Sequence, residues 1–323
     1  MRNGTVLNAV LVTPAGPRSR SGNRVTALRW AALLRRLGVH TRVVEQWRGE
    51  PCELLVAVHA VKSRDSVLAC AQARPATKLV VLLAGTDIYP QFHPDAATLA
   101  ALTRADAIVT LQPQATQVLP EPLRRKARTI VQSAVVAPRP RPTDRFAACV
   151  LAHLRPVKDP LLPFAALRHV PAEVPIHVTV AGRAMSPDLK AAADAAVAAD
   201  PRAHWCGELS RRDALRLLAS SHACLVPSTA EGGANVVSEA IAAGTPVIAT
   251  DIPGNTGLLG TDWPALFAAG DTAALGAILL RCATDSAYYQ ELVRRTLALQ
   301  HLVDPAREQA QWRALLDDLG LTG

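Results

Sequence analysis

Two glutamates eight residues apart, Glu231 and Glu239, flank a turn of glycine and small residues. The turn follows a strand-like run that ends near Pro227 and leads into a helical pattern. Backbone N–H groups at such a turn and at a helix start can bind phosphate. A carboxylate about two helical turns further on suits the hydroxyls of a ribose. The segment therefore predicts a nucleotide site, and the alternative is an ordinary helix start at which the dipole favours an acidic residue.

A second candidate site is the basic loop between the first expected strand and helix, Pro14 to Asn23. Its spacing matches neither an NTP-binding nor a dinucleotide-binding glycine motif. Glycines and arginines at a helix N-terminus suit a small phosphate-like anion, and the alternative is a solvated basic loop. The residues expected to bind this anion are Gly16, Arg18, Arg20, Gly22, Asn23 and Arg24.

Polar residues also end two strand-like runs of the first half. His59 closes the run Leu-Leu-Val-Ala-Val-His, and Thr86 with Asp87 follows the next run. The carboxyl ends of parallel strands are where ligands bind in such sheets. His59 is therefore a candidate for sugar or acceptor binding, and Thr86 and Asp87 are candidates for the acceptor. A structural histidine and an aspartate that caps a turn are the alternatives.

Short β-rich runs alternate with longer helical patterns along the whole chain, which is typical of βαβ units. We therefore expect an α/β protein with two Rossmann-like, doubly wound parallel-sheet domains that face each other across a cleft. Prolines in 136–144 mark the linker, so the expected domains are 1–140 and 141–303. The expected strands are 5–12, 41–46, 54–60, 78–84, 107–111, 129–133, 146–152, 176–181, 204–206, 223–227, 246–249 and 265–268; the expected helices are 23–37, 160–169, 187–199, 211–220, 235–243, 272–283, 286–300 and 304–319.

Charge and composition narrow the function classes. Residues 1–145 carry 21 Lys and Arg against 9 Asp and Glu, a net charge of +12, and the remainder carries −4. A basic half suits an anionic partner, but a bias toward arginine codons explains it as well. With only 4% aromatic residues and no nucleic-acid-binding motif, nucleic acid is not expected as a partner. Six scattered cysteines without a C-x-x-C pair predict no metal site, and no apolar run is long enough for a membrane span. We expect a cytoplasmic protein.

The string Glu-x7-Glu followed by Ala-x-x-Gly-x-Pro-Val resembles the donor site of the GT-B retaining glycosyltransferases of family 4. The resemblance implies that Glu239 holds the ribose, and that Arg155 and Lys158 neutralise the leaving diphosphate. Glu231 and His59 complete the catalytic residues that we expect. It further implies that residues 141–303 bind a UDP-sugar and that the helix 304–323 packs back on the acceptor-binding domain 1–140. The remaining expected donor contacts are Gly232, Gly233, Ala234, Asn235, Val236, Val237, His153, Gly182, Arg183, Gly207 and Leu209.

Further segments are similar to one branch, the selenosugar synthases of selenoneine biosynthesis. They are Leu11 to Ala27, Ala84-Gly-Thr-Asp-Ile-Tyr89 and Ile252-Pro-Gly-Asn-Thr-Gly-Leu-Leu259. This resemblance implies transfer of sugar from UDP-N-acetylglucosamine or UDP-glucose to selenophosphate, with no required metal or cofactor. A selenophosphate synthetase and a selenoneine-forming enzyme would be its pathway neighbours. A family 4 enzyme with a hydroxyl acceptor and a non-catalytic UDP-sugar-binding protein remain alternatives.

Overall fold

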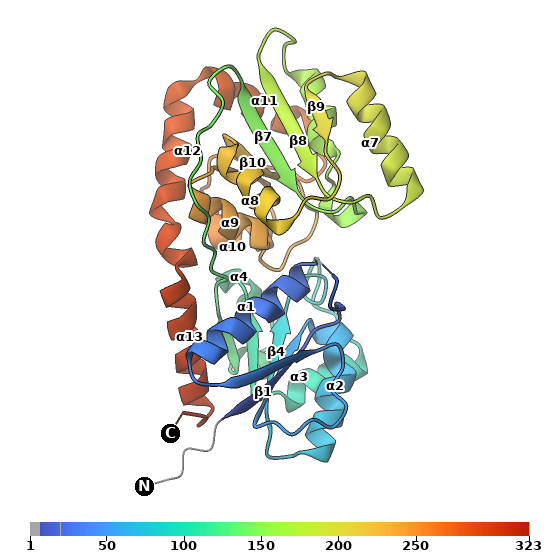
Figure 1. Cartoon of the computed structure of the whole chain (residues 1–323), viewed down its shortest axis with the longest axis vertical. Helices are drawn as coiled ribbons and strands as arrows, with labels where there is room; N and C mark the ends of the chain where they lie inside the picture. Colours follow the sequence, from blue (N-terminus) through green and yellow to red (C-terminus); the bar gives the residue numbers. More distant parts are fainter. Residues whose placement is uncertain (1–6, 20, 323) are drawn as a thin grey trace. The chain divides into compact units, whose positions relative to one another are not determined.

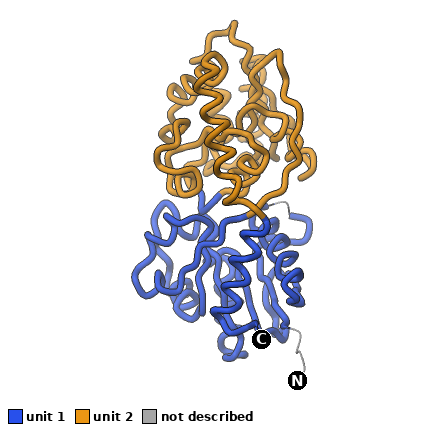
Figure 2. The backbone as a smooth tube through the Cα atoms, turned by 90° about the vertical axis from the view of Figure 1, so that its left-hand side faces the viewer, with its two compact units in different colours: residues 1–132, 231–233, 305–323 blue, residues 133–230, 234–304 orange. Residues whose placement is uncertain are grey.

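Every paired strand of the chain lies parallel to its neighbours, in two sheets of six strands each. The computed structural model describes residues 7–19 and 21–322. They divide into unit 1, which comprises 1–132, 231–233 and 305–323, and unit 2, which comprises 133–230 and 234–304 (Figure 2). The predicted fold class, two Rossmann-like parallel-sheet domains, is confirmed.

The sheet of unit 1 has the order β2-β1-β3-β4-β5-β6. The strand order reverses direction between β1 and β3, which is where such sheets bind ligands. The helix α1 covers one face of this sheet (Figure 1). The elements are β1 (Asn8–Val12), α1 (Gly22–Arg36), β2 (His40–Val44), β3 (Leu54–Val58), α2 (Ala60–Ala73), β4 (Lys78–Leu83), α3 (Ala96–Arg104), β5 (Ala107–Thr110), α4 (Pro113–Gln117), α5 (Glu121–Arg124), β6 (Ala127–Thr129) and α13 (Pro305–Asp318).

The sheet of unit 2 has the order β12-β11-β10-β7-β8-β9. Numbered within the unit this is the 3-2-1-4-5-6 order of dinucleotide-binding folds, with its reversal between β7 and β10. The elements are β7 (Phe146–Leu151), η1 (Pro156–Lys158), α6 (Leu162–Ala166), η2 (Leu167–His169), β8 (Ile176–Ala181), α7 (Pro187–Ala199), β9 (Ala203–Trp205), α8 (Arg211–Ser220), β10 (Ala223–Val226), α9 (Asn235–Ala243), β11 (Val247–Thr250), α10 (Pro253–Leu259), β12 (Leu266–Phe267), α11 (Thr272–Thr284), α12 (Ser286–Ala298) and η3 (Gln300–Val303).

The C-terminal helix α13 is part of unit 1. Its Glu308 is fully buried and accepts hydrogen bonds from Trp30 Nε1 at 2.8 Å and from Arg29 Nε at 3.2 Å, both on α1. The rings of Trp30 and Trp312 meet edge to face, with 4.8 Å between centroids. The helix α13 is therefore held on α1 by two kinds of contact. One is the buried carboxylate of Glu308 with its charged and neutral donors, and the other is the aromatic pair.

The proline-rich segment 136–144 lies in unit 2, so the units divide at 132/133 rather than at the expected 140/141. Arg141 explains this placement, because its Nη2 donates to Gly244 O at 2.7 Å and its Nη1 to Tyr289 Oη at 3.2 Å. The prolines disfavour a helix or a central strand in this segment. They do not prevent a side chain such as that of Arg141 from holding the segment against the rest of unit 2.

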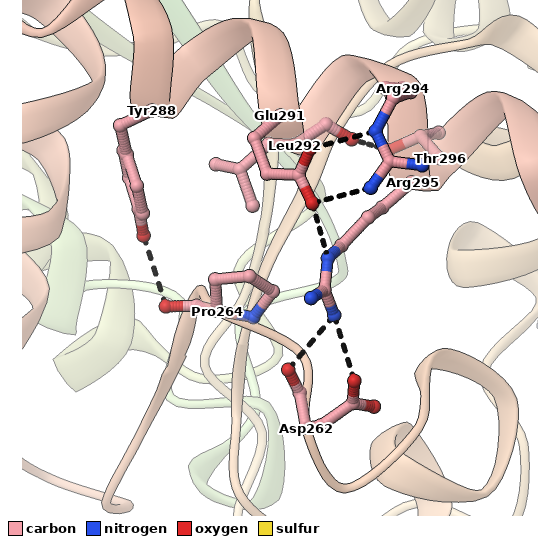
Figure 3. A network of polar contacts seen from close by, with 8 residues as sticks. All are labelled: Asp262, Pro264, Tyr288, Glu291, Leu292, Arg294, Arg295 and Thr296. Carbon is pink, nitrogen blue, oxygen red and sulfur yellow. Dashed lines mark hydrogen bonds and ion pairs between the residues drawn. The ribbon is translucent and has the colours of Figure 1, made fainter.

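The long helix α12 is held to the loop before β12 by a polar network (Figure 3). Glu291 accepts from Arg294 and Arg295, and Arg295 Nη1 also lies 2.9 Å from an Asp262 carboxylate oxygen. Tyr288 Oη donates to Pro264 O at 3.0 Å. The two arginines lower the pKa of Glu291 to about 2. Within the described part of the chain, no helix is both long and apolar enough to cross a membrane.

Candidate functional site

The turn after β7 carries the two expected diphosphate ligands. Arg155 precedes the short helix η1 and Lys158 ends it, and both side chains are half-buried. Thr229 N donates to Val157 O at 2.9 Å, which ties this turn to the end of β10. Because the sheet order reverses between β7 and β10, two cationic side chains stand at the place where such folds bind anionic ligands.

The ends of β7, β8 and β9 are locked together by backbone contacts. Gly182 N donates to Gly207 O at 2.7 Å, and Leu154 N donates to Arg183 O at 2.9 Å. A Cβ on Gly182 would lie 1.8 Å from Ala152 O. Gly182 is therefore required by close packing, a role separate from the donor contact that the resemblance implies for it. Arg183 is exposed and Leu209 is half-buried after β9.

His153 lies in the same cluster of strand ends. Its Nδ1 accepts a hydrogen bond from Arg183 N at 3.2 Å, so the two neighbouring loops fix the orientation of the imidazole. Trp205 Nε1 donates to Gly182 O at 2.8 Å. The loops with the expected donor contacts after β7, β8 and β9 are thus joined by hydrogen bonds within unit 2.

The two glutamates do not lie on one helix. The helix α9 begins only at Asn235, so Glu231 lies in the preceding turn and Glu239 lies on the helix. Gly233 has a φ of 145° and interrupts the helical conformation before Ala234. Both carboxylates are nevertheless buried, at 8% exposure each.

The turn 231–233 is assigned to unit 1 by its contacts, although the residues on either side belong to unit 2. A Cβ on Gly232 would lie 2.5 Å from Ala84 C and O and 2.6 Å from Gly85 N, and one on Gly233 would lie 2.6 Å from Leu111 Cβ. Both glycines are thus needed for a close backbone approach. This role exists alongside any role of their N–H groups in phosphate binding.

The start of α9 and the carboxylate of Glu239 are the two parts of the predicted nucleotide site that lie in unit 2. The N-cap residue Ala234 supplies no side-chain cap, and Val236 and Val237 continue the first turn. Such a helix end favours an anion. Further along, Glu239 Oε1 lies 2.8 Å from Nη1 of the exposed Arg211, the first residue of α8. Arg211 carries no signal in the sequence, because no local motif brings α8 to α9.

The loop between β1 and α1 supplies the expected anion-binding residues of unit 1. Gly16 and Arg24 are half-buried, Arg18 and Gly22 are exposed, and Asn23 is half-buried in the first turn of α1. The expected Arg20 lies outside the described residues. A Cβ on Gly16 would lie 3.3 Å from Glu45 Oε1, so a carboxylate stands beside this loop.

Several buried polar atoms around α1 have no hydrogen-bond partner among the described residues. They are Thr13 Oγ1 after β1, Ser21 Oγ at the N-cap, Arg24 Nε, and Gln132 Oε1. Gln132 Nε2 donates to Thr26 Oγ1 at 2.9 Å, which places its amide against α1. Buried polar atoms are rarely left unpaired in the absence of water or a ligand. Sequence reasoning missed Thr13 and Gln132, which have no motif signal.

His59 and Asp87 meet at the ends of β3 and β4. His59 Nδ1 lies 3.4 Å from Asp87 Oδ2, and His59 Nε2 lies 3.2 Å from Thr86 Oγ1. Burial is the main cause that lowers the pKa of His59, Asp87 opposes this shift, and Lys62 adds to it. Thr86 is exposed, whereas the Asp87 side chain is fully buried.

Much of the positive charge of unit 1 serves the fold. Lys126 Nζ donates to Thr103 O and Ala105 O at the end of α3, and Arg124 donates to Leu119 O and Gln117 O after α4. These cations close helix C-termini, where the dipole favours them. Among the described residues, no cluster of three or more His, Cys, Asp or Glu is arranged to hold a metal ion.

Comparisons with known proteins agree on the architecture. Residues 147–285, from β7 to α11, match the family model of glycosyl transferases group 1. A sucrose-phosphate synthase structure from Thermosynechococcus elongatus is similar with a TM-score of 0.80 and 16% identity, over 98% of this chain and 99% of that one. HepE of Anabaena, in complex with UDP and glucose, gives a TM-score of 0.76 and 15% identity over 97% and 100%. No curated protein sequence matches the chain significantly.

The comparisons show the fold of the chain and a similarity of one segment. The chain has the GT-B architecture of two Rossmann-like units. Its segment from β7 to α11 matches the glycosyl transferases group 1 model, and this segment contains the Arg155–Lys158 turn, the β8 and β9 loops and α9.

Proposed function

We propose that the protein is a glycosyltransferase that uses a UDP-sugar, UDP-N-acetylglucosamine or UDP-glucose, and forms a carbon–selenium bond with selenophosphate. The observation that carries the donor half is that unit 2 contains three features suited to a nucleoside diphosphate. They are the half-buried Arg155 and Lys158, the uncapped start of α9, and the buried Glu239. HepE of Anabaena, whose structure contains UDP and glucose, has the same fold.

In the proposed reaction the selenium of selenophosphate forms a bond to the anomeric carbon as the bond from that carbon to the UDP oxygen breaks. The electron pair leaves with UDP. Arg155, Lys158 and the first amides of α9 stabilise the charge that builds on the diphosphate. Glu239 accepts hydrogen bonds from the ribose, and water later releases phosphate from the product. Because side chains and amides supply the positive potential, we propose that no metal is required.

The acceptor half of the proposal is supported by resemblance of the β1–α1 loop to selenosugar synthases and by the chemistry of that loop. Selenophosphate is already a charged nucleophile, so the enzyme chiefly has to position it and stabilise the leaving group. Ser21 Oγ and Arg24 Nε offer donors to such an anion at the start of α1. We propose that these groups, together with Arg18 and Asn23, bind the acceptor.

A hydroxyl acceptor is the second candidate, favoured by one observation. Gln132 Oε1 is a buried acceptor without a partner among the described residues, and it would be satisfied by an O–H group. A fully ionised anion offers no such donor. Sugar and alcohol acceptors therefore belong in the same assay.

The test is anaerobic incubation with each UDP-sugar and selenophosphate, followed by mass spectrometry for a selenium-containing sugar and by measurement of released UDP. UDP release with a hydroxyl acceptor but no selenium product would reject the acceptor assignment. UDP binding without turnover of any acceptor would indicate a non-catalytic binding protein. Activity that survives complete chelation is expected, and its loss with recovery on adding a divalent ion would reject the metal-free mechanism.

Variants connect the result to the residues. Glu239→Gln should weaken UDP binding about tenfold to a hundredfold, because a charged hydrogen bond contributes roughly 1.5–3 kcal/mol. Lys158→Ala should lower kcat more than it weakens UDP-sugar binding, since charge on the diphosphate grows in the transition state. Arg212→Ala is the matched control, because Arg212 is an exposed neighbour of Arg211 on α8. Equal effects of Glu239→Gln and Arg212→Ala would contradict the assignment.

A further inference from the structure

Arg211 is a cation at the end of a helix where the dipole disfavours one. It is the first residue of α8, directly after the N-cap residue Ser210. The positive end of a helix dipole lies there, so an acidic side chain is favoured and a basic one is not. Asp213, the acidic residue of this turn, accepts hydrogen bonds from Ser210 Oγ at 2.6 Å and from Arg216 Nη1 at 3.0 Å. The placement of the Arg211 side chain therefore needs a reason outside its own helix.

That reason is the carboxylate of Glu239 on α9, the helix beside α8 in unit 2 (Figure 1). Glu239 Oε1 lies 2.8 Å from Arg211 Nη1, the distance of a charge-assisted hydrogen bond. A carboxylate that is nearly buried is costly unless positive or hydrogen-bonding groups compensate its charge. Arg211 supplies part of this compensation in the free protein.

The exposed fractions of the two side chains show on which side of Glu239 the guanidinium lies. The side chain of Glu239 is 10% exposed, whereas that of Arg211 is 53% exposed. On its inner side Glu239 is close to the sheet. The pKa of the fully buried Cys224 on β10 is raised by its hydrogen bond with Cys149 and by burial, and the negative charge of Glu239 adds to this shift. Arg211 therefore covers the outer side of the carboxylate, from which a dissolved ligand would reach it.

A ribose and a guanidinium compete for the same acceptor atoms. The vicinal hydroxyls of a ribose can both donate hydrogen bonds, and an ionised carboxylate can only accept them. An ion pair whose cation is half exposed contributes little free energy, because water and salt screen it. A diol that brings two donors can therefore replace Arg211 on Glu239 at a small cost.

We propose that Arg211 is an exchangeable counter-ion, which occupies the carboxylate of Glu239 in the free protein and leaves it when a nucleoside binds. The inference rests on the proposed function for the role of Glu239 as the ribose ligand. It gives Arg211 an effect on specificity. Every ligand that binds through a vicinal diol must first displace the guanidinium, whereas a ligand without the diol leaves the ion pair intact.

The test is the binding of uridine to the full chain, measured by NMR titration, which also detects weak binding. Uridine is neutral, so its affinity does not depend on the attraction between an arginine and phosphate groups. Arg211→Ala should bind uridine about two- to fivefold more tightly than the wild type, which is the size of an exposed ion pair. Arg212→Ala is the matched control, because Arg212 is the exposed neighbour on α8, and it should bind uridine as the wild type does.

Three further measurements connect the effect to the ion pair and to the diol. Raising the KCl concentration from about 0.05 to 0.5 M should tighten uridine binding to the wild type more than to Arg211→Ala, because salt screens the pair. The compound 2′,3′-dideoxyuridine should bind equally well to both proteins. In a Glu239→Gln background, Arg211→Ala should no longer raise the affinity for uridine, as a double-mutant cycle requires of a direct pair.

Weaker or unchanged uridine binding in Arg211→Ala would overturn the inference, because Arg211 would then support the bound ribose or have no part in its binding. An equal gain in affinity for uridine and for 2′,3′-dideoxyuridine would overturn it as well. Both results leave the proposed function intact, since the wild type still binds the nucleoside. Failure of the wild type to bind either uridine or UDP would instead reject the proposed function, and with it the ribose as the ligand of Glu239.

Discussion

The glycine at the end of β8 offers the sharpest test of how the candidate nucleotide site is built. In Gly182→Ala the new Cβ would meet Ala152 O at 1.8 Å, Ala152 C at 2.5 Å and His153 Cα at 2.8 Å. Ordinary contact begins near 3.4 Å, so the carbonyl has to move by about 1.6 Å. Both partners are backbone, and no side-chain rotation can relieve the contact.

The size of the effect follows from what this movement disrupts. The strand ends are joined by Ala152 N to Ala181 O at 3.1 Å, Leu154 N to Arg183 O at 2.9 Å and Gly182 N to Gly207 O at 2.7 Å. Overpacking costs typically 1–3 kcal/mol, and each weakened hydrogen bond adds about 0.5–1.5 kcal/mol. We expect the local stability of this region to fall by roughly 3–5 kcal/mol.

Hydrogen exchange measured on peptides of residues 146–185 is the suitable assay, because it reports local opening in a chain of two units. The expected change is about a hundredfold to a few thousandfold faster exchange in Gly182→Ala. Gly207→Ala is the matched control. Gly207 has a φ of 67° but nothing within 4 Å of its Cβ position, so only the left-handed cost of about 1–2 kcal/mol applies. Equal acceleration in the two variants would refute the packing argument.

Three further predictions concern contacts that position the elements. Glu308→Ala should lower the local stability of α13 by roughly 2–4 kcal/mol, because it leaves Trp30 Nε1 without its buried acceptor. Hydrogen exchange in α13 should become faster, and Glu308→Gln should have a smaller effect. Arg294 and Arg295 lower the pKa of Glu291 to about 2. The contribution of the ionised Glu291 to the stability of the fold is therefore complete above about pH 4.5 and is lost as the pH falls toward 2. Urea unfolding at stepped pH should show this loss, and Glu291→Gln should lack it. Arg141→Ala should accelerate exchange in 136–144, and unchanged exchange there would contradict its role.

Most of the fold is predictable because it depends on local patterns. The apolar runs of the sheets are visible in the sequence, and four of the expected helices begin after a residue of the preferred N-cap types, Ser186, Ser210, Asp271 and Asp285, each of which caps its helix in the structure. The helix α2 was missed for an equally physical reason. The side chain of its N-cap residue does not cap it, and the amide of Ala60 is instead bound by Asp87, in the turn after β4 and 27 residues further on. No pattern within α2 reveals such a remote cap.

The residues of the candidate site likewise include some whose place a local pattern predicts and others whose place depends on distant parts of the chain. The sequence pattern placed His59 at a strand end, and the structure has it directly after β3. The sequence suggested that Gly232 and Glu231 belong to a phosphate-binding helix start. The helix begins later because the chain first turns tightly at Gly233 and approaches Ala84 and Leu111. A sequence shows that glycine is present, but it does not show whether a ligand or a neighbouring backbone requires it.

Net charge was the weakest guide to the proposed anion site. The first half carries +12, yet cations such as Lys126 and Arg124 are engaged by backbone carbonyls at helix ends. The buried atoms around α1 without a partner among the described residues are fewer and of mixed character: Arg24 Nε is a donor, Gln132 Oε1 is an acceptor, and the hydroxyls of Thr13 and Ser21 can be either. One ligand that satisfied all of them would have to offer both an acceptor and a donor. The charge count permits any anion, whereas these unpaired atoms call for a ligand with both kinds of group.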